Sequence, residues 1–183
     1  AGYTAWRGVV PFDHTRLQIG ETWGHGARFG QIPMQGNRVY WFATHTTPAG
    51  QHSPDGEKAA LLRLFGNWHA PIRALIEATP EAAILRNDIY DRPPLTQWGR
   101  GRVTLLGDAA HPMTPNLGQG ACQALEDAVM LAKQLQATPD IPTALRAYEA
   151  ARIPRTTMIV NQSRQVGAVG QWANPVAVAG RNF

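Results

Sequence analysis

The segment from Gly107 to Asp127 constrains this chain more than any other feature. It reads GDAAHPMTPNLGQGACQALED, with a short apolar run, 103–106, in front of it and an amphipathic helical pattern behind it. This order predicts a buried strand, a sharp turn that carries a carboxylate, a loop stiffened by prolines, a glycine pair and the start of a helix. Open α/β sheets bind ligands at the carboxyl ends of their strands, so the segment predicts a site for a polar, extended ligand.

Asp108 and the glycine pair carry the chemistry of this segment. An ionised carboxylate only accepts hydrogen bonds, so Asp108 suits the hydroxyls of a ribose or ribityl chain, although a turn Asp can also bond its own backbone. Gly118 and Gly120 leave room for a flat ligand close to the backbone. The free N–H groups of the following helix favour negative charge by about 0.3–1 kcal/mol. Each element alone has a purely structural explanation, but their fixed spacing predicts a cofactor site.

Composition fits a globular chain. The 183 residues are 44% hydrophobic, which is enough for one domain or for parts of two. We expect no membrane span, because no uncharged apolar run reaches about 18 residues. The start, Ala1 to Trp6, lacks the basic and apolar regions of a signal peptide and resembles the middle of a strand. The sequence therefore suggests a fragment of a longer chain.

The charged and metal-binding residue types exclude several functions. The formal charge is +4, and fifteen arginines against two lysines are scattered along the chain. Nucleic-acid binders usually cluster their basic residues, whereas scattered arginines suit carboxylates and anionic ligands, so we expect no nucleic-acid partner. The six histidines show no ligand spacing, and we predict no metal. The single cysteine, Cys122, allows no internal disulfide and favours a reducing cytoplasm.

The first half of the chain predicts antiparallel β-structure covered by helices. Alternating, aromatic-rich segments predict strands at residues 3–10, 16–23, 27–34 and 38–44, with a turn at 35–37. Helical spacing follows from Asp55, a plausible cap, and Pro71 opens a second short helix. A further strand is expected around 83–90. The segment 91–94, DRPP, is the candidate domain boundary.

The second half predicts one strand and a set of helices. Residues 102–106 are expected to form a strand buried on both faces, as in a parallel sheet. A second helix begins near Pro142, and Pro154 is expected to break or kink it. The tail from Asn174 shows no clear period. The helix that begins at Gly120 has apolar positions at the 3.6-residue period, namely Ala121, Leu125, Ala128, Val129, Ala132 and Leu135.

These motifs resemble a known family. The segments 107–115, 118–120 and 126–128 closely resemble the second FAD motif of the single-component FAD-dependent monooxygenases of the aromatic hydroxylase type, related to p-hydroxybenzoate hydroxylase. The segment 152–155 is similar to an Arg-x-x-Arg element of the same family, and 26–42 is similar to its substrate-domain sheet. The urate hydroxylase and zeaxanthin epoxidase-like branch is the most similar.

The resemblance implies a mixed α/β fold in two parts. Residues 1–91 would be most of an antiparallel substrate-binding domain with covering helices. Residues 92–183 would be the C-terminal segment of a Rossmann-like FAD-binding domain, with its last strand and helices. The family's N-terminal glycine motif and its second motif for FAD and NAD(P)H are absent here. The resemblance therefore implies the C-terminal part of such an enzyme, inactive alone, with a missing N-terminal half or an oligomeric partner.

The resemblance also implies roles for individual residues. The family uses FAD, NAD(P)H and O2 to hydroxylate or epoxidise an aromatic or conjugated small molecule. Arg28 and Tyr40 match positions that face the substrate, although each could equally be a structural residue of the sheet. The cofactor would contact Asp108, Pro115, Leu117, Gly118, Gln119, Gly120 and Ala121.

Three other functions remain open from the sequence. The motif does not distinguish a monooxygenase from a flavin oxidoreductase that inserts no oxygen. The missing N-terminal motif favours a third possibility, a non-catalytic binding or assembly module with the same fold. A basic nucleic-acid binder would show retention on DNA or RNA that depends strongly on salt.

Overall fold

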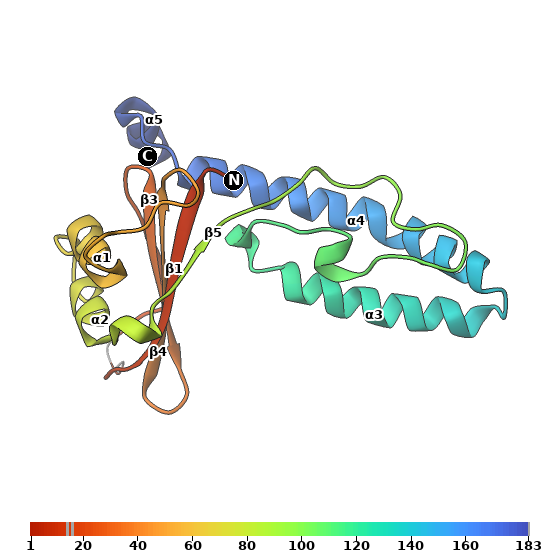
Figure 1. Ribbon diagram of the computed structural model, residues 1–183, viewed down its shortest axis with the longest axis horizontal. Helices are drawn as coiled ribbons and strands as arrows, with labels where there is room; N and C mark the ends of the chain where they lie inside the picture. The colour runs from red at the N-terminus through yellow and green to blue at the C-terminus, as the bar shows by residue number, and fades with distance from the viewer. Residues whose placement is uncertain (14, 16, 183) are drawn as a thin grey trace. The chain divides into compact units, whose positions relative to one another are not determined.

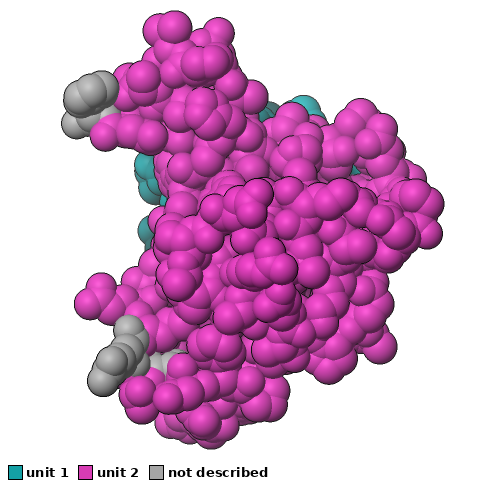
Figure 2. Space-filling model, turned by 90° about the vertical axis from the view of Figure 1, so that its left-hand side faces the viewer, with its two compact units in different colours: residues 1, 90–168 teal, residues 2–89, 169–183 magenta. Residues whose placement is uncertain are grey.

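The computed structural model describes residues 1–13, 15 and 17–182, and it divides the chain into two compact units. The sheet unit comprises Gly2–Ile89 and the chain from Val169 onward. The helical unit comprises Ala1 and Tyr90–Ala168. Figure 2 colours the sheet unit magenta and the helical unit teal. The chain therefore passes into the helical unit at Tyr90 and returns to the sheet unit at Val169.

The sheet unit is built on one antiparallel sheet of five strands in the order β2-β3-β4-β1-β5 (Figure 1). The expected strands at 3–10, 27–34 and 38–44 are confirmed, and the turn at 35–37 joins two of them. The expected strand at 16–23 is shorter than predicted, and its residue Arg16 lies outside the described residues. A fifth strand, β5, lies within the predicted range 83–90 and follows a short 3-10 turn, η1. The bounds are β1 Tyr3–Pro11, β2 Gly20–Trp23, β3 Ala27–Met34, β4 Arg38–Thr46, η1 Glu81–Ala83 and β5 Leu85–Asp88.

Two helices, α1 (Glu57–Phe65) and α2 (Ile72–Ala78), cover one face of the sheet (Figure 1). Aromatic side chains dominate this core, because each buries about 150–250 Å². The Trp41 indole N–H donates to the Thr79 hydroxyl at 2.9 Å and ties β4 to the end of α2. The core side chains of the strands are Trp6, Val10, Ala27, Phe29, Val39, Trp41 and Ala43.

The expected capping role of Asp55 is wrong. The residue before α1 is Gly56, and the carboxylate of Glu81 accepts the first N–H groups of the helix, from Glu57 at 2.8 Å and from Lys58 at 3.1 Å. Asp55 instead pairs with Arg63, which lowers the pKa of the Asp55 carboxyl to about 2. Glu81, on the 3-10 turn η1, therefore caps α1 in place of Asp55, the residue that the sequence predicted.

The tail, which shows no clear period in the sequence, contains a short helix, α5 (Pro175–Arg181). The Asn174 side chain accepts the N–H groups of Val176 and Ala177, and Pro175 occupies the first turn, where its missing N–H costs nothing. Arg181 donates to the carbonyls of Trp23 and Gly24 at 3.4 and 3.1 Å. These contacts hold the tail on the sheet unit.

The helical unit contains two long helices and two 3-10 turns. They are η2 (Gly107–Ala109), η3 (Pro115–Leu117), α3 (Gly120–Ala137) and α4 (Ile141–Gly170), the last two residues of α4 belonging to the sheet unit. The start of α3 at Gly120 is confirmed. Of the expected break or kink at Pro154, the break does not occur, because helix α4 runs unbroken through this residue. Buried groups on both sides of the proline, Arg152 and Thr156, hold the helix in place.

The strand expected at 102–106 does not form. This segment has only an isolated bridge between Arg100 and Val103, and the Val103 side chain is 67% exposed. A parallel strand takes its hydrogen bonds from neighbouring strands, and the described part of the helical unit contains none. The mixed α/β class with an antiparallel sheet is confirmed, but the expected parallel strand pairs with no other strand among the described residues.

Helix α3 turns its apolar stripe outward. Leu125 and Val129 are 69% and 71% exposed, whereas the residues buried on this helix are Gln123 and Asp127. The predicted period is correct, but the fully buried residues of α3 are polar, and Met130 and Leu131 supply its apolar contacts with the core of the helical unit. An apolar stripe (Ala121, Leu125, Ala128, Val129, Ala132 and Leu135) is therefore exposed in this chain.

Candidate functional site

The candidate site begins at the turn that carries Asp108. Gly107 has a φ of 59°, a left-handed conformation that favours glycine, and its N–H donates to the Asp127 carboxylate at 3.0 Å. Gly107 is buried and Asp108 is exposed. The turn therefore presents the Asp108 carboxylate on the surface of the helical unit.

The second side of the site is the start of α3. Gly118 has a φ of 62°, and a Cβ added there would meet no atom within 4 Å. A Cβ added to Gly120 would lie 4.0 Å from Asp108 Oδ1 and 3.9 Å from Met113 Cγ. The backbone before α3 is thus open to a ligand, and the Asp108 carboxylate lies beside it.

The seven predicted cofactor residues lie on η2, on η3, at the start of α3 and, for Gly118 and Gln119, in the link between η3 and α3. Of these, Gln119 immediately precedes α3 and has no capping hydrogen bond from its side chain to the helix. The first N–H groups of α3 are therefore not capped by that side chain and can bind a ligand. The exposed members of the set are Asp108, Pro115, Gly118 and Ala121, and the half-buried members are Leu117, Gln119 and Gly120.

The loop around Pro115 is fixed to helix α4. Asn116 Nδ2 donates to the Thr114 hydroxyl and to the Ser163 carbonyl, both at 2.9 Å. The Ser163 hydroxyl donates to the Thr114 carbonyl at 2.6 Å. A Cβ on Gly167 would lie 2.3 Å from Asn116 Nδ2, so only glycine lets this loop approach the helix so closely.

A buried charged network lies behind the Asp108 turn. The Asp127 carboxylate accepts from Arg152 Nε and from His111 Nε2, both at 2.6 Å, in addition to Gly107. Glu126 binds both Arg152 and Arg155, and these contacts, that of Arg155 above all, lower the pKa of Glu126 to about 2. Glu126 also accepts from Gln123 Nε2 at 3.3 Å, one turn earlier on α3. Arg152 lies 25 residues from Asp127 in the chain, so no local sequence pattern indicates that the two side chains pair.

The two predicted substrate residues lie in the sheet unit, on the face turned away from α1 and α2. Arg28 on β3 pairs with Thr44 on β4, and Ile32 pairs with Tyr40, so side-chain alternation places Arg28 and Tyr40 on the same face. Arg28 is only 3% exposed and forms an ion pair with Glu21 at 3.2 Å. Arg28 Nε also donates to the Thr44 hydroxyl at 3.3 Å.

Tyr40 differs from Arg28 in its surroundings. It is half-buried and its ring lies 6.3 Å from that of Phe42. Burial raises the pKa of the Tyr40 phenol, and the positive charge of Arg7 partly offsets this rise. Arg7 lies on the same face, because Val9 pairs with Tyr40 and Arg7 with Phe42. Sequence analysis missed Arg7, since only the register of β1 and β4 brings it near Tyr40.

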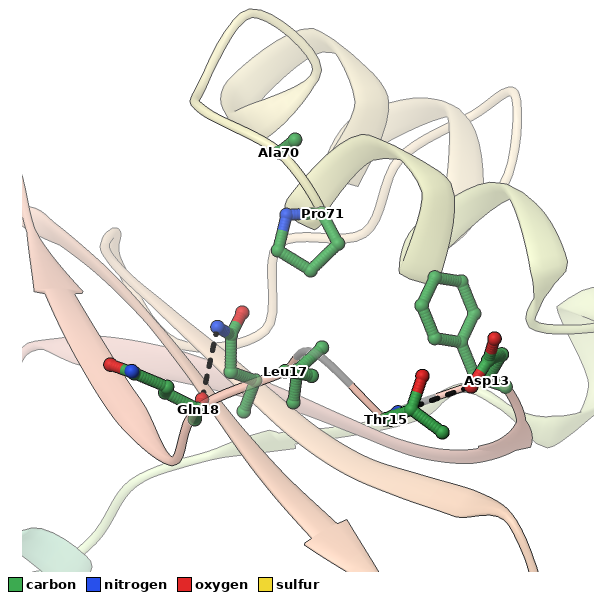
Figure 3. Close-up of a pocket in the computed structure, with 8 residues that line it drawn as sticks. Asp13, Thr15, Leu17, Gln18, Ala70 and Pro71 are labelled. Carbon is green, nitrogen blue, oxygen red and sulfur yellow. Dashed lines mark hydrogen bonds between the residues drawn. The ribbon is translucent and has the colours of Figure 1, made fainter.

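A separate hollow in the sheet unit contains none of the predicted site residues. Figure 3 shows Asp13, Thr15, Leu17 and Gln18 on one side of it and Ala70 with Pro71 on the other. Gln31 Nε2 donates to the Gln18 carbonyl at 3.4 Å, and Thr15 N–H to the Asp13 carboxylate at 3.1 Å. We assign this hollow no function.

Two kinds of feature are absent from the part of the chain that the structure describes. Among those residues, no group of three or more His, Cys, Asp or Glu side chains could hold a metal ion. Likewise, within 1–13, 15 and 17–182, no helix is sufficiently long and apolar to cross a membrane.

Comparison with known proteins defines the class of this chain. The sequence matches the model of the FAD binding domain family over residues 10–163, which is most of its length, and the chain therefore belongs to that family. It is 50% identical over 179 residues to the aurachin C monooxygenase/isomerase of Stigmatella aurantiaca. It is 43% identical over 178 residues to the chloroplastic zeaxanthin epoxidase of Solanum lycopersicum.

The solved structure of Klebsiella pneumoniae HpxO, complexed with FAD and uric acid, has a TM-score of 0.91 and 35% identity to this chain. The alignment covers 100% of this chain and 49% of HpxO. The alignment with the aurachin C enzyme covers 97% of this chain and 47% of that enzyme. The alignment with the zeaxanthin epoxidase covers 90% of this chain and 27% of the epoxidase. The chain thus spans about half, or less, of the length of these relatives.

Proposed function

We propose that this chain is the C-terminal part of an FAD-dependent monooxygenase that hydroxylates or epoxidises an aromatic or conjugated small molecule. One observation carries the proposal: the Asp108 carboxylate lies beside the glycine-opened start of α3. The family and the monooxygenase relatives support the same reaction class.

The residues present fit FAD at this site. Asp108 is an exposed acceptor for the hydroxyls of a ribityl or ribose chain. Gly118 has open space in front of it, so a flat ring can approach the backbone of 118–121. Pro115 and Leu117 would flank that ring. The N–H groups at the start of α3 would favour negative charge on it by about 0.3–1 kcal/mol.

When bound, FAD would supply the redox chemistry, with NAD(P)H as the reductant and O2 as the oxygen source. The protein's part is to bind, to orient and to exclude water. On the substrate side we propose Tyr40, whose hydroxyl would orient the substrate through a hydrogen bond, and Arg28, whose charge would support the same face. The ion pair with Glu21 already compensates part of the Arg28 charge.

The exposed apolar stripe of α3 supports a further part of the proposal. Monomeric proteins rarely expose a large continuous apolar surface. The relatives are about twice as long as this chain or longer. We propose that the N-terminal half of the family fold, or a partner chain, covers the stripe. A cytoplasmic location stays a proposal that rests on the single cysteine.

The reaction is tested with the protein in its native, complete form. The protein is loaded with FAD and supplied with NADH or NADPH, ¹⁸O₂ and a panel of aromatic and conjugated compounds. The proposal predicts a product that contains one ¹⁸O atom. NAD(P)H oxidation with no labelled product would support a flavin oxidoreductase instead. A colourless protein that takes up no added FAD would support a non-catalytic module.

The substrate side has its own test. Tyr40→Phe keeps the ring that packs near Phe42 and removes only the hydroxyl. We expect kcat/KM for the labelled product to fall by about tenfold or more, with an unchanged melting temperature. The matched control is Tyr90→Phe, since Tyr90 is 70% exposed and outside the site. Equal activity of the two variants would remove Tyr40 from the substrate side.

A further inference from the structure

The buried carboxylate of Asp127 joins the Asp108 turn to both long helices of the helical unit. Asp127 lies on α3 and is 0% exposed. Its Oδ2 accepts the Gly107 N–H at 3.0 Å and binds His111 Nε2 at 2.6 Å, while its Oδ1 accepts from Arg152 Nε of α4 at 2.6 Å. The backbone of the turn is thus bonded directly to an ion pair inside the unit.

The ion pair is itself held on several sides. Arg152 Nη2 donates to the carbonyl of Gln123 at 3.2 Å and to its side-chain oxygen at 2.8 Å. Arg152 Nη1 donates to Glu126 at 2.7 Å. A buried charge that loses its partner is strongly destabilising, so the network has little freedom to rearrange. The position of the Asp127 carboxylate is therefore fixed by both helices.

His111 adds a further contact to the Asp127 carboxylate. Its Nε2 lies 2.6 Å from Asp127, and its ring packs near that of Trp98. The Nδ1 atom is buried without a hydrogen-bond partner among the described residues. A proton on Nδ1 would leave an unsatisfied N–H in the interior, so the proton belongs on Nε2, where it bonds Asp127.

Gly107 needs this support because of its conformation. Its φ of 59° is accessible to glycine without strain, but a glycine has no side chain of its own to hold the turn. We infer that Asp127 is a positioning residue for the flavin site: by holding the Gly107 N–H, it fixes the direction of the Asp108 carboxylate next to α3. This inference rests on the proposed function, in which Asp108 contacts FAD.

The test compares Asp127→Asn with a matched control, Glu149→Gln. Glu149 is also buried, and it pairs with Arg146 at 2.6 Å and accepts the Thr104 hydroxyl at 2.5 Å. Both variants neutralise a buried acid that is paired with an arginine, but only Asp127 touches Gly107. The two variants are made in the native, complete protein, and their melting temperatures are measured first.

Two readouts follow. Hydrogen exchange of the Gly107 amide is measured without flavin, and the FAD dissociation constant is measured by quenching of flavin fluorescence. We expect Asp127→Asn to expose the Gly107 amide and to weaken FAD binding by about tenfold or more. We expect Glu149→Gln to leave both quantities within about twofold of the wild type. The same exchange rate and the same FAD affinity in both variants would overturn the inference.

Asp127→Glu keeps the test decisive if the Asn variant does not fold. It retains the charge but moves the carboxylate oxygens by one methylene group. We expect weaker FAD binding from a folded protein, and wild-type affinity would contradict a positioning role. Failure of the wild-type protein to bind FAD would instead defeat the proposed function. The exchange data would still decide whether Asp127 holds Gly107.

Discussion

The Asp108 carboxylate lies beside the first residue of α3: its Oδ1 is 4.0 Å from the position that a Cβ on Gly120 would take. The loop between these residues folds back, and Asn116 ties it to α4. A ligand hydroxyl bound to Asp108 would therefore lie close to the N–H groups at the start of the helix. The same surface therefore offers a ligand one hydrogen-bond acceptor, the Asp108 carboxylate, and several donors, the N–H groups at the start of α3.

Gly120→Ala should separate the stability of the protein from flavin binding. The new methyl group fits the fold, since its nearest neighbours are at 3.9 and 4.0 Å. Alanine favours a helix over glycine by up to about 1 kcal/mol, so the melting temperature should stay equal or rise. The methyl group would occupy the open backbone surface, and FAD affinity should fall. Thermal denaturation and a fluorescence titration measure the two effects. A more stable variant with wild-type affinity would show that no ligand approaches Gly120.

Gly167→Ala should loosen the loop around Pro115. Its Cβ would lie 2.3 Å from Asn116 Nδ2, which bonds Thr114 and Ser163. Overpacking of this kind costs about 1–3 kcal/mol. The matched control is Gly180→Ala in α5, where an added Cβ meets nothing within 4 Å and the change should be neutral or stabilising. The free energies of unfolding in urea measure both changes. Equal stability of the two variants would contradict the close contact.

The sequence predicted this meeting of Asp108 and Gly120 because it depends on local order. A turn, a stiff loop and a helix start follow one another within a short segment, and each has a local signal. The support behind the site could not be predicted in this way. Asp127 and Arg152 lie 25 residues apart on separate helices, and neither carries a local sign of its partner.

The inward face of α3 could not be predicted for a related reason. The 3.6-residue period located the apolar stripe, but periodicity does not tell which body of protein the stripe contacts. Inside this unit the helix instead buries Gln123 and Asp127. The expected strand at 102–106 likewise depends on protein outside its own segment. It does not form, because the described part of the helical unit has no neighbouring strand with which it could pair.

Ionised Glu126 should make the free energy of unfolding depend on pH below about 4.5. Hydrogen bonds from Arg155, followed by those from Arg152, lower the Glu126 pKa from 4.5 to about 2. A lowered folded-state pKa contributes stability that is complete above the unfolded value, near 4.5, and is lost as the pH falls through about 2. Arg155→Gln should raise the pKa of Glu126 toward 4.5. The wild type and the variant should then differ in stability above that pH and converge toward pH 2.

The carboxyl carbon of Glu126, followed by NMR, measures its titration directly. Arg63→Gln is the matched control, because Arg63 pairs with Asp55 in the sheet unit. The control should leave the Glu126 titration unchanged. An unchanged Glu126 pKa in Arg155→Gln would contradict the assigned cause of the shift.

The apolar stripe of α3 should matter for association and not for the stability of the unit. Leu125 and Val129 are mostly exposed, so replacing both with Glu should change the unfolding free energy of this chain by only about 0.5 kcal/mol per site. The same change should abolish self-association, or binding of the N-terminal half of the family fold, in sedimentation velocity. Gln136→Glu, at an exposed polar position of α3, is the control. Undiminished association of the Glu variant would show that the stripe is not an interface.

The most direct test of the account is a fluorescence titration of FAD with the complete wild-type protein and with Asp108→Asn. The Asn side chain has nearly the same shape but lacks the charge and one acceptor. We expect saturable FAD binding by the wild type and an affinity weaker by about tenfold, or about 1.4 kcal/mol, in the variant. Equal affinities, with both proteins folded, would contradict the central claim that Asp108 binds the flavin cofactor.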